Sequence, residues 1–152
     1  MSTPAEKRGL LLDTSFILPL FGVDMGPRVA KILKHLDTKG LRAYYSPFSL
    51  MEAVFVLIRE VRRGKVSLSE VAEMAAAGAK NTLASLKRLE AQPEAYRLAI
   101  QMYEEGHHDL FDNLIYASAF YGDVSLLTLD EELIDFVKRM GLPNIAVHLS
   151  SP

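Results

Sequence analysis

The stretch from His107 to Leu133, HHDLFDNLIYASAFYGDVSLLTLDEEL, decides how we interpret the fold. It begins with a helical pattern over residues 109–121, continues as the apolar run VSLLTL, and ends in the start of another helix. An apolar run bounded by turn residues is typical of a strand that is buried on both faces. A helix, a buried strand and a second helix in this order predict an α/β fold with a parallel sheet.

The rest of the chain repeats this alternation. The remaining strands are expected at 9–13, 41–46, within 85–92 and at 144–149. The helices that connect the five strands are expected at 14–21, at 26–39, from near Pro47 to Gly64, from Ser67 or Ser69 to about 83, and at 93–106, 109–121 and 130–141. In an open parallel sheet, ligands bind outside the carboxyl ends of the strands, so a site is expected at that edge.

Length and composition limit the alternatives. The chain has 152 residues, no cysteine and a formal net charge of −2, which fits a single domain over residues 1–152. The absence of cysteine excludes disulfides, thiol catalysis and thiolate metal sites, and no run approaches the roughly 20 apolar residues of a membrane span. We therefore expect a cytoplasmic protein without membrane contact, in which residues 1–8 form a flexible N-terminal segment.

Acidic residues fall where this edge is expected. Asp13 follows the first strand, Asp130 follows the fourth, and Glu52 lies early in the helix after the second strand. Asp109 and Asp112 open the helix before the fourth strand, with the spacing of residues on one helix face.

Helix capping is the alternative explanation, and for each acid taken alone it is the simpler one. Asp13 and Asp109 stand where an N-cap is expected. The pairs Ser49–Glu52 and Thr128–Glu131 match the capping box, in which case Asp130 is an ordinary first-turn acid.

Capping does not explain why the acids would converge on one edge. Carboxylates held within a few ångströms of one another repel, so such a cluster must take up protons or bind a cation. Oxygen ligands select a hard cation, Mg²⁺ or Mn²⁺. Magnesium binds substrate phosphate readily, which indicates phosphoryl chemistry.

Four segments together resemble the PIN domain family of metal-dependent ribonucleases, which includes the VapC-type toxins of toxin–antitoxin pairs. They are LLLDTSFIL, SPFSLMEAV, DLFDNLIYASA and LLTLDEEL, and the resemblance runs from about residue 9 to the end of the chain. It implies a three-layer α/β/α sandwich with a five-stranded parallel sheet in the order 3-2-1-4-5.

The resemblance also assigns the site. It implies a catalytic quartet of Asp13, Glu52, Asp112 and Asp130. Of these, Asp13, Asp112 and Asp130 are the expected ligands of Mg²⁺ or Mn²⁺, joined by Glu52 or Asp109 as further ligands. Thr14, Ser15 and Thr128 match supporting polar positions near the quartet.

The expected function is hydrolysis of RNA phosphodiester bonds, with water activated by the bound ion attacking in line. The expected partners are single-stranded RNA, an antitoxin protein and a second copy of the chain in a homodimer. Two alternatives remain: an RNA-processing nuclease without an antitoxin, and a non-catalytic PIN-like module that binds RNA or protein. A phosphatase of the haloacid dehalogenase type would need an aspartate at Ser15, and the acidic pair and lysine of a receiver domain are not evident.

Three further features have two explanations each. His107 and His108 precede the acidic helix and either contact phosphate or act as proton donors, or have no role. The basic segment from Arg59 to Lys65 either contacts RNA backbone or forms a solvated helix end. The Ala-rich segment 70–86 indicates close helix packing, within the chain or at a dimer interface.

Overall fold

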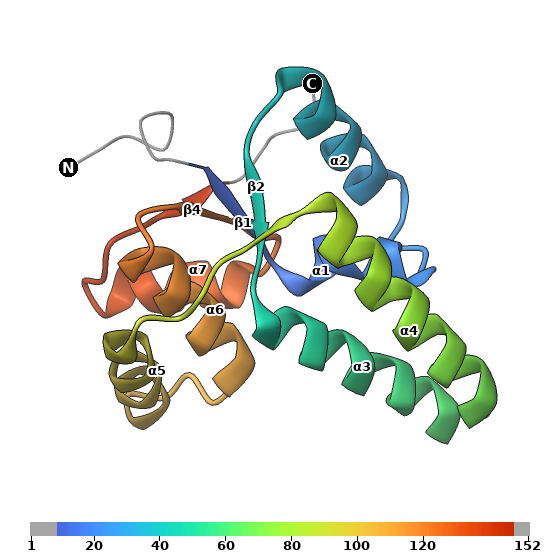
Figure 1. Cartoon of the computed structure of the whole chain (residues 1–152). Coiled ribbons are helices and arrows are strands. Elements are labelled where there is room, and N and C mark those ends of the chain that lie inside the picture. Colours follow the sequence, from blue (N-terminus) through green and yellow to red (C-terminus); the bar gives the residue numbers. More distant parts are fainter. Residues whose placement is uncertain (1–8, 148–152) are drawn as a thin grey trace.

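The structure is a computed structural model that describes residues 9–147 of the chain (Figure 1). The N-terminal segment 1–8, which we predicted to be flexible, lies outside the described residues, as do residues 148 and 149 of the last predicted strand. Among the described residues, no helix is both long and apolar enough to cross a membrane.

Parallel strands form the centre of the molecule, in the order β3-β2-β1-β4-β5. They are β1 (Leu10–Leu12), β2 (Ala43–Tyr45), β3 (Lys87–Arg88), β4 (Ser125–Leu127) and β5 (Ala146–Val147). Leu11 of β1 lies opposite Tyr44 of β2 on one side and Leu126 of β4 on the other. The outer strands β3 and β5 have two residues each, so the sheet is best formed at β2, β1 and β4. The predicted α/β class with a parallel sheet is confirmed.

The central strand β1 shows why an unbroken apolar run is needed here. Leu10, Leu11 and Leu12 are all buried, and successive side chains of a strand point to opposite faces. Leu10 and Leu12 pack into one hydrophobic cluster, whereas Leu11 packs into a second one. Helices must therefore cover both faces of the sheet, which gives three layers.

Two groups of helices supply these outer layers, and Figure 1 shows them on either side of the strands. The first layer consists of α1 (Thr14–Ile17), the 3-10 helix η2 (Leu18–Phe21), α2 (Pro27–Lys39), α3 (Pro47–Arg62) and α4 (Leu68–Ser85). The second layer consists of α5 (Pro93–Glu104), α6 (Leu110–Tyr121) and α7 (Glu131–Arg139).

Helix α3 begins earlier than the capping-box alternative requires. Ser46 is its N-cap, with the hydroxyl accepting a hydrogen bond from Phe48 N at 3.1 Å, and Pro47 is its first residue. Ser49 is therefore inside the helix and buried, so the Ser49–Glu52 capping box is wrong. Glu52 lies in the second turn, where its carboxylate is not used to cap the helix.

The Ala-rich segment packs within the chain. Helix α4 starts with a capping box formed by Ser67 and Glu70 and runs to Ser85, after which the chain enters β3. At Gly78 an added Cβ would lie 2.1 Å from the Phe21 ring of η2, so only glycine permits this close approach. The small residues of α4 therefore serve, at least in part, its contact with η2.

Candidate metal centre

Asp13 is held rigidly at the carboxyl end of β1. Its backbone N–H donates to Leu127 O of β4 at 3.0 Å, and its side chain caps α1. One carboxylate oxygen accepts from Thr14 N at 2.8 Å, and the other accepts from the Thr128 hydroxyl at 2.6 Å. Asp13 is thus both a helix cap and a fixed carboxylate at the sheet edge, so the two explanations given for this residue are compatible.

Thr128 connects the ends of β1 and β4. Its hydroxyl donates to Asp13 and accepts from Asp130 N at 3.0 Å, and it is fully buried. The cap of α7 is Asp130, whose Oδ1 accepts from Leu133 N at 3.1 Å. The Thr128–Glu131 capping box is therefore wrong, because the threonine hydroxyl is engaged by the two aspartates instead.

Asp109 and Asp112 have different roles at the start of α6. Asp109 is the N-cap, and its Oδ1 accepts from Asp112 N at 3.1 Å. This leaves the carboxyl group of Asp112 available to neighbours outside its own helix.

The structure brings Asp13, Glu52 and Asp112 together, although they lie far apart in the sequence. Each of the three offers one carboxylate oxygen, and these oxygens all lie within 4.8 Å of one another. We refer to these three residues as the acid cluster. They come from the end of β1, from α3 and from α6, which meet at the carboxyl edge of the sheet.

The pKa of each carboxyl group in the acid cluster is raised. Burial is the main cause for all three. The pKa of Asp112 reaches about 10, because burial is reinforced by a hydrogen bond with Asp130 and by the negative charges of Asp13, Asp109 and Glu52. For Asp13, burial outweighs the hydrogen bonds from Thr128 and Thr14, which lower the pKa.

Asp130 and Asp109 therefore lie close to the acid cluster without belonging to it. The hydrogen bond between the Asp112 and Asp130 carboxyl groups requires a proton between them, and the charges of Asp130 and Asp109 both raise the pKa of Asp13. In the absence of a cation, these side chains must share protons to coexist.

A hydroxyl group completes the set of oxygens. Thr14 Oγ1 is buried, and among the described residues it forms no hydrogen bond of acceptable geometry. It does lie close enough to Glu52 to lower the pKa of that residue, which burial raises. Three converging carboxylates and an unsatisfied hydroxyl fit the donor set of a hard divalent cation. Ser15, the other predicted supporting residue, is partly exposed, and its side chain forms no hydrogen bond within residues 9–147.

The two histidines pack rather than face the acid cluster. The ring of His107 is buried and tilted against that of Phe136, with 5.1 Å between the ring centroids. A 2.6 Å hydrogen bond joins its Nδ1 to Asn113 Oδ1. Asn113 Nδ2 donates to His107 O at 2.7 Å, which fixes the loop that leads into α6. Our sequence analysis did not single out Asn113, although a polar side chain in a strongly apolar helix was a usable signal. His108 is exposed and packs against Tyr103 at 4.8 Å.

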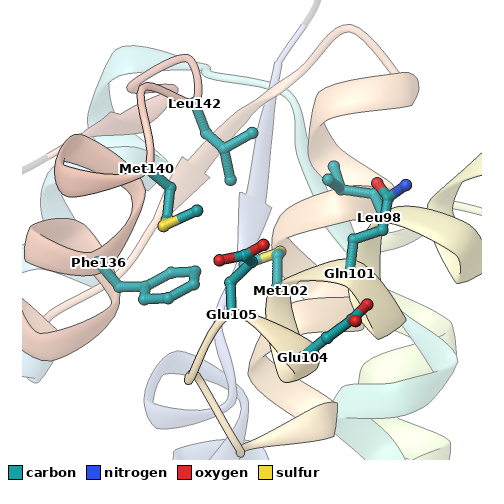
Figure 2. Close-up of a pocket in the computed structure, with 8 residues that line it drawn as sticks. All are labelled: Leu98, Gln101, Met102, Glu104, Glu105, Phe136, Met140 and Leu142. Atoms are coloured by element: carbon teal, nitrogen blue, oxygen red, sulfur yellow. The ribbon is translucent and has the colours of Figure 1, made fainter.

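Two cavities of similar size open on the surface. The first, which we call the α3–α6 groove, has a volume of about 350 Å³ and includes Glu52 of the acid cluster. It is lined by Glu52, Phe55, Ile58, Arg59, Arg62, Asp109 and Phe111. The second, the α5–α7 cavity, has a volume of about 330 Å³ and is lined by Leu98, Gln101, Met102, Glu104, Glu105, Phe136, Met140 and Leu142. Figure 2 shows Phe136 and Met140 facing Met102 and Glu105 across this second cavity, which contains no residue of the acid cluster.

The chain matches a known protein family. The family model for the PIN domain matches residues 10–138. A search of curated protein sequences gives no significant match.

Several solved structures share the fold at low sequence identity. PAE2754 from Pyrobaculum aerophilum is 24% identical with a TM-score of 0.57, over 90% of this chain and 83% of that one. A toxin–antitoxin complex from Klebsiella pneumoniae is 17% identical with a TM-score of 0.53, over 94% and 99% of the two chains. VapC20 of Mycobacterium tuberculosis, described as a toxin that cleaves the sarcin–ricin loop, is 16% identical with a TM-score of 0.57, over 88% and 96%.

Proposed function

Because the chain belongs to the PIN domain family, we propose that it is a divalent-metal-dependent endoribonuclease that hydrolyses RNA phosphodiester bonds. The observation that carries the proposal is the acid cluster, in which oxygens of Asp13, Glu52 and Asp112 lie within 4.8 Å of one another. A cluster of this kind is costly for the fold unless a cation or protons neutralise it. Mg²⁺ or Mn²⁺ is the cation that such oxygen ligands favour.

The residues have distinct roles in this proposal. Asp13 and Asp112 would bind the ion directly, and Asp130 would bind it directly or through water. When bound, the ion would supply Lewis-acid stabilisation of the phosphate and lower the pKa of a water molecule. Glu52 would orient the attacking water and accept its proton, a task to which a carboxyl group with a raised pKa is suited.

Supporting residues would hold these groups in place. Thr128 fixes Asp13 through its 2.6 Å hydrogen bond, and the unsatisfied hydroxyl of Thr14 would bind water next to Glu52. Ser15, which is partly exposed, would add a polar group at the edge of the metal site. Asp109, which caps α6, would influence the site mainly through its negative charge and less as a metal ligand.

The chain would act as the toxin of a toxin–antitoxin pair. Support comes from the solved structures that share its fold, which include a toxin–antitoxin complex from Klebsiella pneumoniae and VapC20 of Mycobacterium tuberculosis, described as a toxin. The partner would then be an antitoxin protein. An RNA-processing nuclease without an antitoxin would have the same site. Co-purification of this chain with the product of a neighbouring small gene would distinguish a toxin from such a nuclease.

A homodimer is also part of the proposal. Tyr96, Ile100 and Tyr103 lie on one face of α5 and are each about half exposed, at 50%, 58% and 47%. A row of large apolar side chains of this kind is suited to an interface. Light scattering during gel filtration tests this, and a monomer at micromolar concentration would contradict it.

The test of the activity uses labelled single-stranded RNA. The purified chain should cleave it in Mn²⁺ and not in EDTA, and the Asp13→Asn variant, confirmed as folded by circular dichroism, should lose the Mn²⁺-dependent cleavage. Cleavage that persists in EDTA or in the variant would reject the proposed site.

A further inference from the structure

We propose that the α3–α6 groove binds the RNA strand beside the scissile phosphate, with a base stacked on Phe55 and backbone phosphates held by Arg59 and Arg62. This inference rests on the proposed function, because it places the strand relative to the acid cluster. It adds a binding site along the α3 face that begins at Glu52 and extends away from Asp13 and Asp112.

The residues concerned form one continuous face of α3. Glu52, Phe55, Arg59 and Arg62 are spaced by three, four and three positions, which places them on one side of a helix. With a rise of about 1.5 Å per residue, Arg59 lies roughly 10 Å from Glu52 along the helix axis and Arg62 roughly 15 Å. The groove therefore runs from carboxylates at one end to guanidinium groups at the other.

An aromatic surface lies between these two ends. The side chain of Phe55 is 50% exposed, and its ring centroid lies 5.9 Å from that of Phe111 with 47° between the ring planes. Rings tilted in this way leave no parallel gap for a base between them. They leave an exposed ring face of Phe55 on which one base can stack, with Phe111 supporting the ring from α6.

The two arginines are available for phosphate. Both are exposed, and within the described part of the chain neither forms an ion pair, although the charge of Arg59 lowers the pKa of Glu52, which burial raises. Two neighbouring basic residues are already paired, since Arg63 and Lys65 contact Glu60 at 3.1 and 3.6 Å. The basic segment that the sequence analysis singled out is thus divided into paired residues outside the groove and unpaired residues lining it.

The exposed arginines of the groove matter because the chain as a whole is slightly acidic. A net charge of −2 provides no general attraction for a polyanion, so any attraction has to come from a local group of basic residues. An exposed aromatic ring beside guanidinium groups is the combination that binds single-stranded nucleic acid. The two acidic residues that line the groove, Glu52 and Asp109, lie toward its other end, which leaves the guanidinium groups for an anionic ligand.

The test measures RNA binding separately from cleavage. Fluorescence anisotropy of a labelled single-stranded RNA of mixed sequence would be recorded in EDTA, with the intact RNA checked on a gel, for the wild-type chain and two groove variants. Phe55→Leu keeps an apolar helix-forming residue and removes the ring, and should weaken binding between about fivefold and about 100-fold. Arg59→Gln should reduce the slope of log affinity against log salt by about 0.7.

Matched controls remove the same groups elsewhere. Tyr121→Leu removes an exposed aromatic ring at the other end of α6, and Arg63→Gln removes a paired charge of the same basic segment. Both should bind RNA as the wild type does, within about twofold.

Each outcome decides the inference. Groove variants that bind RNA as tightly as the wild type, or a wild-type chain that does not bind RNA, would overturn it, and in the first case a peptide ligand becomes the better explanation for the groove. Binding that depends on Phe55 and Arg59 without any cleavage in Mn²⁺ would support the groove and reject the nuclease. Cleavage that is unaffected in both groove variants would support the nuclease and reject the groove.

Discussion

The α3–α6 groove and the α5–α7 cavity differ in chemistry although they are nearly equal in size, at about 350 and 330 Å³. The groove begins at the acid cluster, where side chains from three separate elements converge and raise one another's pKa. The cavity is lined mainly by apolar side chains, such as those of Met102 and Phe136, and Glu104 and Glu105 stand next to each other on one helix end (Figure 2).

A concave surface alone therefore does not identify a binding or catalytic site. Ligand sites combine apolar surface with a few polar groups that converge on one point. Perturbed pKa values mark such convergence, because a shift of this kind requires burial together with nearby charge. On the groove side, burial and nearby charges occur together at the acid cluster, so variants of the two regions should behave differently.

The largest difference is expected for single carboxylates. Asp112→Asn should reduce the rate of Mn²⁺-dependent RNA cleavage at least about 100-fold, because it removes a ligand and a charge from the acid cluster. Glu105→Gln is the matched change in the α5–α7 cavity and should leave the rate within about twofold. Single-turnover kinetics measure both rates. Equal rates for the two variants would show that the acid cluster and the α5–α7 cavity do not differ in their importance for cleavage.

Thermal stability in EDTA should distinguish the same two residues. Asp112 has an ordinary pKa of 3.8 and a pKa of about 10 in the folded chain, so the folded state holds this proton more tightly than the unfolded state does. The stability that this provides is complete below pH 4 and is lost as the pH rises toward 10. Asp13 and Glu52 act in the same direction, since burial raises the pKa of both.

The melting temperature of the wild-type chain in EDTA should therefore fall by several degrees between pH 5 and pH 9. Asp112→Asn removes the largest of these titrations and should flatten the dependence, whereas Glu105→Gln should retain it. Differential scanning calorimetry at several pH values measures this, and a wild-type melting temperature that rises over the range would contradict the raised pKa values.

A smaller effect is expected at Thr128, which holds Asp13 without lining the groove. Thr128→Val removes the 2.6 Å hydrogen bond to Asp13 and should slow cleavage by about tenfold or more, with weaker Mn²⁺ dependence. Thr128→Ser keeps the hydroxyl and should restore most of the rate. If serine and valine variants were equally slow, packing rather than the hydrogen bond would be the cause.

The smallest effect should come from the cavity itself. Met140 is 39% exposed at its rim, and Met140→Ala should change the cleavage rate by less than about twofold while lowering the melting temperature by no more than a few degrees. A large loss of cleavage in this variant, with the fold intact, would show that the α5–α7 cavity takes part in the function.

The sequence predicted the sheet edge well because the relevant signals are local. The apolar runs of β1 and β4 and the acids that follow them directly place Asp13 and Asp130 at one edge of a parallel sheet. The predicted start of α3 near Pro47 is confirmed, with Ser46 as the cap, whereas the alternative Ser49–Glu52 capping box is wrong. Several polar side chains match capping patterns equally well, and only packing decides which of them is used.

Long-range pairings were beyond the reach of the sequence. Nothing local indicates that the Thr128 hydroxyl binds Asp13, at a separation of 115 residues, instead of capping α7. The pairing of His107 with Asn113 and the approach of Phe111 to Phe55 likewise depend on how α6 packs. Burial raises the pKa of Asp13 and the Thr128 hydrogen bond lowers it, so the convergence of Asp13, Glu52 and Asp112 was predictable from the sequence while a contact that sets their charge was not.

The most direct test of the central claim is a calorimetric titration of Mn²⁺ into the wild-type chain and into folded Asp112→Asn. If the acid cluster holds a divalent ion, the wild type should bind Mn²⁺ saturably, and the variant should bind it at least about tenfold more weakly. Equal binding by the two proteins, or no saturable binding by the wild type, would contradict the claim.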